Sequence, residues 1–97
     1  FYTNGSYGTV EKIAVAGGEP EILADGQAFP FGIVSEGDWV FWGNAEGGQV
    51  MAIQLGSDQP MVLAEGQTKV RGMDANGQYL VWARNHLGGS VWGMVLP

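Results

Sequence analysis

The chain repeats itself at a fixed spacing of 40 residues. The segment Leu-Ala-x-Gly-Gln, for example, occurs at 23–27 and again at 63–67. Further pairs at this spacing are Phe1 and Phe41, Asn4 and Asn44, Val10 and Val50, Pro20 and Pro60, and Trp42 and Trp82. A period of this length is typical of propellers, solenoids and arrays, whose units must stack on neighbours to bury a core.

One full period predicts four short strands. Residues 31–35, 39–43, 49–55 and 61–64 are rich in β-branched, aromatic and other apolar residues, and Gly, Asp and Pro separate them. No segment has a helical apolar period that Gly or Pro does not interrupt. Four strands per period indicate a propeller blade. We therefore expect an all-β fold: a β-propeller segment of about two and a half four-stranded antiparallel blades.

The blade boundaries follow from the repeat. Residues 1–28 make a partial blade, 29–68 a full blade and 69–97 a second partial blade. Trp and Tyr residues of such a piece would be left in water unless further blades cover them. The expected partners are therefore neighbouring blades, which belong either to the same longer chain or to identical subunits. The start at Phe1, in the middle of a motif, favours the longer chain.

Two tetrapeptides carry a family resemblance. Phe1-Tyr2-Thr3-Asn4 and Phe41-Trp42-Gly43-Asn44 resemble the tetrapeptide of YWTD repeats, and 30–34 is similar to the strand that precedes it. YWTD repeats form the blades of six-bladed propellers of the low-density-lipoprotein-receptor class B type. The recurring short segments of this chain resemble those of secreted bacterial versions. The third copy departs from the pattern, because it reads Val81-Trp82-Ala83-Arg84 and has Val70 where the second has Pro30.

Composition excludes several classes of function. The net charge is −6, and the only fixed cations are Lys12, Lys69, Arg71 and Arg84, which form no stripe along the chain. Nucleic-acid binding and attachment to an anionic membrane both need clustered cations, so neither is expected. Without cysteine there is no disulfide or thiolate metal site. No apolar run is long enough to span a bilayer.

Structural roles explain the candidate catalytic residues better than catalytic roles do. Most of the ten carboxylates fall at predicted turns, and a lone histidine, His86, cannot build a histidine-rich metal site. The glycine pairs have no helix behind them, so they predict turns and not phosphate loops. We expect no catalytic residue, no metal ligand and no cofactor. The remaining alternative is Ca²⁺ held by Asp74, which ends a predicted inner strand.

The loops of one face are the expected binding site. Tyr7 and Phe29 fall in loops at the same end of the predicted strands, unlike the aromatics that alternate within strands. Propeller ligands usually sit on one such face, so by fold analogy it is the place for a site. The candidate ligand-binding residues on it are Tyr7, Phe29, Glu46, Lys69, Arg71, Arg84 and His86.

Three functions fit these observations. The leading one is a non-catalytic binding or scaffold module for a protein or carbohydrate ligand in an exported or cell-surface bacterial protein, with an extracellular, periplasmic or surface location. The alternative is part of a six-bladed propeller enzyme, a metal-dependent hydrolase or lyase with its site in the central channel, for which Asp74 and His86 are the candidates. A lectin with one site per blade is disfavoured, because Tyr7 aligns with Gly47 and Phe29 with Lys69.

Overall fold

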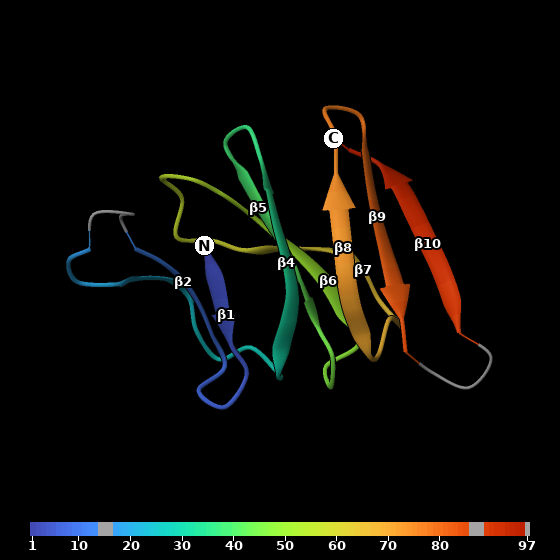
Figure 1. The fold of residues 1–97 in the computed structure, drawn as a ribbon, viewed down its shortest axis with the longest axis horizontal. Helices are drawn as coiled ribbons and strands as arrows, with labels where there is room; N and C mark the ends of the chain where they lie inside the picture. Colours follow the sequence, from blue (N-terminus) through green and yellow to red (C-terminus); the bar gives the residue numbers. More distant parts are fainter. Residues whose placement is uncertain (14–16, 86–88, 97) are drawn as a thin grey trace.

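The computed structural model describes residues 1–13, 17–85 and 89–96, and across these ranges it contains strands and turns but no helix (Figure 1). The strands are β1 (Tyr2–Asn4), β2 (Thr9–Lys12), β3 (Glu21–Ala24), β4 (Pro30–Glu36), β5 (Trp39–Asn44), β6 (Gln49–Gln54), β7 (Met61–Ala64), β8 (Val70–Ala75), β9 (Tyr79–Arg84) and β10 (Ser90–Val95). The predicted all-β class is confirmed. Over the same ranges there is no helix of the length and apolarity needed to cross a membrane.

The strands form three antiparallel sheets in chain order. The first sheet is β1-β2-β3, the central sheet is β4-β5-β6-β7 and the third sheet is β8-β9-β10. In the central sheet the four strands agree with the predicted ranges to within one residue at each end. Each sheet lies inside one of the three predicted units. Among the described residues, short Gly-containing connections at 5–8, 37–38, 45–48 and 76–78 join consecutive strands, as a meander requires.

The three sheets stand side by side, and their first strands are neighbours (Figure 1). Strand β4 contacts β1 on one side and β8 on the other. Two glycines allow the close approach of the third sheet. A side chain at Gly32 would meet the carbonyl of Arg71, and one at Gly43 would meet the side chain of Val70. The approach of β8 to the central sheet therefore depends on two missing Cβ atoms.

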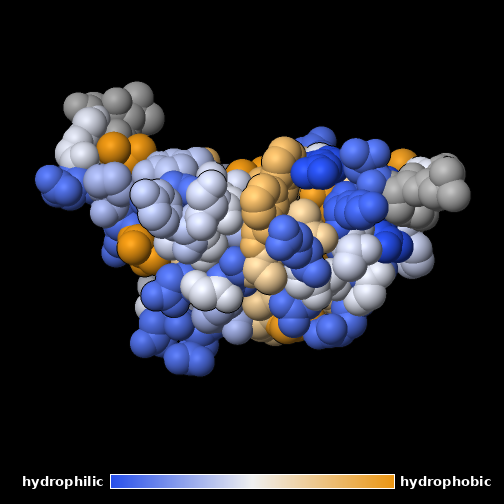
Figure 2. Space-filling model, turned by 90° about the horizontal axis from the view of Figure 1, so that it is seen from below, coloured by the Kyte–Doolittle hydropathy of each residue, from blue (hydrophilic) through white to orange (hydrophobic). Residues whose placement is uncertain are grey.

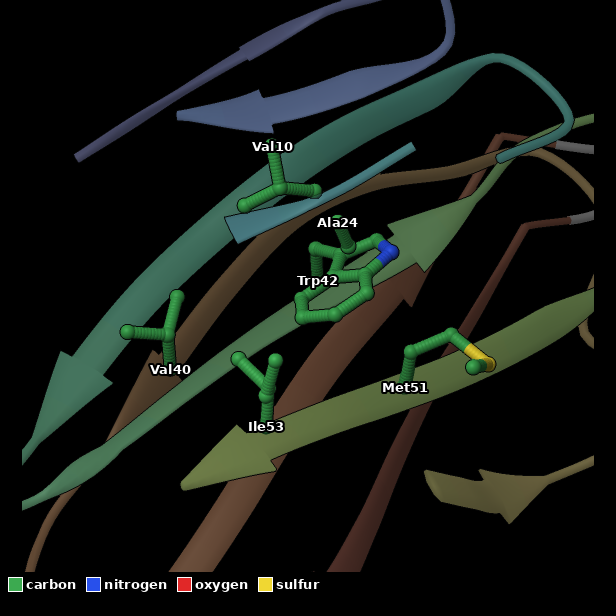
Figure 3. Packing of buried hydrophobic residues seen from close by; sticks show 6 residues of the cluster. All are labelled: Val10, Ala24, Val40, Trp42, Met51 and Ile53. Carbon is green, nitrogen blue, oxygen red and sulfur yellow. The ribbon is translucent and has the colours of Figure 1, made fainter. Parts of the chain in front are cut away.

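Each gap between sheets is filled by a separate apolar core. The first core lies between the first and central sheets, with Trp42 among aliphatic side chains (Figure 3). Its buried members are Val10, Ala24, Val40, Trp42, Met51 and Ile53. The second core lies between the central and third sheets, and its buried members are Phe41, Val50, Ala52, Val70, Leu80 and Trp82. Val10, Val40 and Trp42 of the first core correspond at the 40-residue spacing to Val50, Leu80 and Trp82 of the second.

Irregularities of the backbone recur at the same spacing. The register of β4 against β5 shifts between Pro30 and Ile33, and that of β8 against β9 shifts between Val70 and Met73. The residue just before each of these strands has a positive φ, 59° at Phe29 and 63° at Lys69. Neither residue is a glycine, although this backbone region favours glycine. The repeat thus preserves local geometry as well as the apolar pattern.

Candidate functional site

Four of the predicted binding residues line one cleft. Phe29, Glu46, Lys69 and Arg71 surround a cleft of about 500 Å³ at the loop ends of the central and third sheets. Ala45 and Thr68 complete its lining, and we call these six residues the loop-end cleft. Figure 2 looks onto this end of the molecule and shows an apolar band with hydrophilic side chains beside it. The structure brings these residues together from three separate loops and from the start of β8.

The other three predicted residues have different places. Arg84 lies at the edge of the cleft, where its guanidinium donates to the backbone oxygen of Thr68 at 2.9 Å and to its hydroxyl at 3.2 Å. Tyr7 lies in the β1–β2 turn, is 80% exposed and does not line the cleft. His86 lies outside the described residues.

A series of backbone hydrogen bonds fixes the walls of the cleft. The oxygen of Phe29 accepts from the nitrogen of Ala45 at 2.9 Å, and the oxygen of Ala45 accepts from Lys69 at 2.7 Å. The oxygen of Lys69 in turn accepts from Asn85 at 2.8 Å. The series runs from the central sheet to the end of β9. It holds Phe29 and Lys69 in their left-handed conformations, so the cleft is formed before any ligand arrives.

Aromatic rings form one side of the site. Phe29 stacks on Phe31 with ring centres 6.5 Å apart and planes 13° apart. The guanidinium of Arg71 lies over the Phe31 ring, 4.6 Å from its centre. Sequence analysis missed Phe31 as a site residue. Strand alternation could not have indicated it, because Phe29 precedes β4 and has a positive φ.

Thr68 and Ala45 were also missed. Ala45 contributes its backbone, and Thr68 fixes the Arg84 side chain. Neither residue type carries a signal of its own in a sequence. Adjacency to Glu46 and Lys69 was the only available indication.

Cations collect at this end of the molecule. Lys69 and Arg71 line the cleft and Arg84 lies at its edge, whereas Lys12 is paired with Glu21 in the first sheet at 3.0 Å. This is the only ion pair among the described residues. A protein of net charge −6 therefore presents three of its four fixed cations around one cleft. The sequence showed no stripe of cations along the chain, but the predicted loop face already included Lys69, Arg71 and Arg84.

Metal-binding groups are not assembled in the described part of the chain. No group of three or more His, Cys, Asp or Glu side chains lies there in a position to hold an ion. Asp74, the carboxylate singled out for Ca²⁺, lies in β8, is exposed and accepts a hydrogen bond of 2.9 Å from the nitrogen of Ala75. Its surroundings are those of a carboxylate that caps local backbone.

Comparison with known proteins adds no relative. No model of a protein family matches the chain, and no curated protein matches it. The resemblance to YWTD repeats therefore stays a prediction.

Proposed function

We propose that the chain is a segment of a β-propeller that acts as a non-catalytic binding or scaffold module, with the loop-end cleft as its ligand site. Two features support the propeller. The sheets stand side by side with their first strands adjacent. The two cores between them contain residues that correspond to one another at the 40-residue spacing. Both are what a radial array of blades requires.

One observation carries the binding function. Phe29, Glu46 and Lys69 from three loops converge with Arg71 of β8 on a single cleft whose backbone is fixed by hydrogen bonds. Concave sites with an apolar wall and a few polar groups are the usual form of a ligand site. The cleft contains no pair of side chains in the arrangement of a nucleophile and its base, so binding is the chemistry that it supports best.

Further sheets of the same repeat are the partners that we propose for the scaffold role. Phe41 and Val50 of the central sheet pack against the third sheet. The counterpart of Phe41 at the 40-residue spacing is Val81, and the counterpart of Val50 is Val91, which pairs with Ala83 as Val50 pairs with Gly43. Val81 and Val91 are 42% and 80% exposed. A sheet with the same apolar pattern would cover them as the third sheet covers the central one. This surface therefore fits a further blade.

The location that we propose, at the bacterial cell surface or outside the cell, rests on the sequence resemblance alone. At that location the module would meet a ligand that is present outside the cytoplasm. The texture of the repeats, with Gly-Gly-x-Pro at 17–20 and Leu-Ala-x-Gly-Gln at 23–27, supports this proposal.

The test is a binding survey with the intact protein on arrays of glycans and peptides. We expect retention of a defined probe that is lost in the double variant Lys69→Met/Arg71→Met and kept in the control Lys12→Met, which removes a cation far from the cleft. Equal retention by both variants would contradict the proposal. Turnover of a glycan or ester that stops on metal chelation would instead favour the enzyme.

A further inference from the structure

The loop-end cleft is an electropositive place on an acidic protein. The charged ends of Lys69 and Arg71 have no carboxylate within ion-pair distance among the described residues. Arg71 also makes no side-chain hydrogen bond in this part of the chain and is oriented by the Phe31 ring beneath it. A guanidinium on an aromatic face keeps its N–H donors at the edge available. Such a fork matches a carboxylate with two parallel hydrogen bonds.

Glu46 sets a second requirement for the ligand. Its exposed carboxylate lines the same cleft as Lys69 and Arg71. A carboxylate only accepts hydrogen bonds, so a ligand that fills the cleft must offer donors as well as an anion. A highly anionic polymer would meet repulsion from Glu46 and from the net charge of −6. The ligand thus combines an isolated negative charge with nearby hydroxyl or amine groups.

Phe29 adds an apolar face and a neighbouring cleft. Its ring is 39% exposed and separates the loop-end cleft from a second cleft of about 230 Å³, which Phe29 also lines. The second cleft has no charged side chain and contains Thr3 and Ser6. An aromatic wall between a cationic cleft and a hydroxyl-lined cleft suits a ligand with an uncharged unit next to a charged one.

We infer that the loop-end cleft binds an acidic sugar, a pyranose that carries a carboxylate, next to a neutral sugar in the second cleft. The inference rests on the proposed binding function and names its ligand class. The carboxylate accepts from Arg71 and Lys69, the ring hydroxyls donate to Glu46, and the C–H face of the sugar packs on Phe29. A peptide with one acidic residue meets the charge requirement but supplies fewer donors for Glu46.

The test is calorimetric titration of the intact protein with three probes. Cellobiouronate and cellobiose differ only in a carboxylate in place of a hydroxymethyl group, and the dipeptide N-acetyl-Glu-Phe-amide carries one carboxylate without a sugar. We expect cellobiouronate to bind at least about tenfold more tightly than either other probe, as a charge-assisted hydrogen bond implies.

Variants identify the cleft as the place of binding. Arg71→Met keeps an apolar stem over Phe31 and removes the charge, and we expect it to weaken cellobiouronate by about tenfold or more with little effect on cellobiose. Arg71→Lys should lie between, because it keeps the charge but loses the fork. Lys12→Met is the matched control and should bind as the wild type does. Thermal melts of each variant verify that it is folded.

Four results would overturn the inference. Equal binding of cellobiouronate and cellobiose would show that the carboxylate is not recognised. Unchanged cellobiouronate binding in Arg71→Met would show that the cleft is not its site. Tighter binding of the dipeptide, lost in Arg71→Met, would refute the acidic sugar and leave the binding function standing. If no probe binds to folded protein, the acidic sugar is refuted, and the array survey decides the binding function by itself.

Discussion

The side-chain oxygen of Gln67 accepts a hydrogen bond of 3.0 Å from the indole nitrogen of Trp82. The backbone nitrogen of Gln67 donates to the oxygen of Gly48 at 2.7 Å. One residue thus joins the β5–β6 turn of the central sheet to β9 of the third sheet. The same arrangement recurs 40 residues earlier, where Gln27 accepts from Trp42 at 3.2 Å.

This contact predicts a stability cost for Gln67→Met. Trp82 is 4% exposed and Gln67 is 6% exposed, so loss of the acceptor leaves a buried indole N–H unpaired. The free energy of unfolding should fall by about 1–3 kcal/mol. Urea denaturation of the intact protein measures it, with the exposed Gln54→Met as the control, expected within about 0.5 kcal/mol of wild type. Equal costs in the two variants would mean that the hydrogen bond between the sheets contributes nothing.

The repeat allowed the strands to be predicted, because each strand is an apolar or β-branched run between Gly, Asp or Pro residues. It also indicated Gln27 and Gln67 as a recurring pair without saying what they do. A recurring polar residue reports a shared environment, and only the fold shows that the environment is a tryptophan of the next sheet. Long-range contacts of this kind depend on how sheets pack, which local pattern does not encode.

The candidate site was predicted in part for a similar reason. The predicted loop face included Phe29, Glu46, Lys69 and Arg71, which line the cleft, but it also included Tyr7, which does not. Loops at the same end of the strands differ in the direction in which they point their side chains. That direction follows from backbone geometry such as the positive φ of Phe29 and Lys69.

Gly43 predicts a compensating pair. A Cβ at Gly43 would overlap the side chain of Val70, so Gly43→Ala should lower the free energy of unfolding by about 1–3 kcal/mol. Val70→Ala in the same chain should recover a part of this loss, because it removes Cγ1, which would lie 2.5 Å from the added Cβ, while the Cβ of residue 70 stays at the same distance. Thermal denaturation of the two single variants and the double variant gives the coupling free energy between the two substitutions.

The control for this pair is Gly72→Ala. No atom lies within 4 Å of a Cβ built there, so the change should be nearly neutral. Strict additivity of Gly43→Ala and Val70→Ala would contradict the close packing of β5 against β8.

Lys69→Asn predicts a gain in stability together with a loss of binding. Lys69 holds φ at 63°, where lysine is strained and asparagine is better tolerated. We expect the free energy of unfolding to rise by about 0.5–1 kcal/mol. Lys12→Asn, in β2, should give no such gain. Loss of stability in Lys69→Asn, measured in urea, would show that the lysine side chain itself supports the loop.

The Tyr2–Glu11 pair predicts a change at alkaline pH. The Tyr2 hydroxyl donates to Glu11 at 3.0 Å, and this hydrogen bond to a carboxylate raises the pKa of Tyr2 above its ordinary value. Because the folded state favours the protonated phenol, its stabilising effect is complete below the unfolded pKa of about 10 and is lost as pH rises through the folded pKa.

Absorbance titration of the phenolates measures this effect. In Glu11→Gln the negative charge is removed, so the pKa of Tyr2 should fall toward that of a free tyrosine. An unchanged titration curve would mean that Tyr2 and Glu11 are not paired in solution.

The exposed face of the third sheet gives the last prediction. Val91 is 80% exposed in this structure, yet its counterpart Val50 is fully buried against the third sheet. If a further sheet covers Val91 in the intact protein, Val91→Arg should lower the free energy of unfolding by about 2 kcal/mol or more, because an unpaired charge would be buried. The matched control is Val62→Arg on β7, 44% exposed, with an expected cost of about 0.5 kcal/mol or less. Urea denaturation with both variants separates the outcomes: a cost confined to Val91 indicates a covered face, and equal small costs would place that face in solvent and contradict the proposed neighbour.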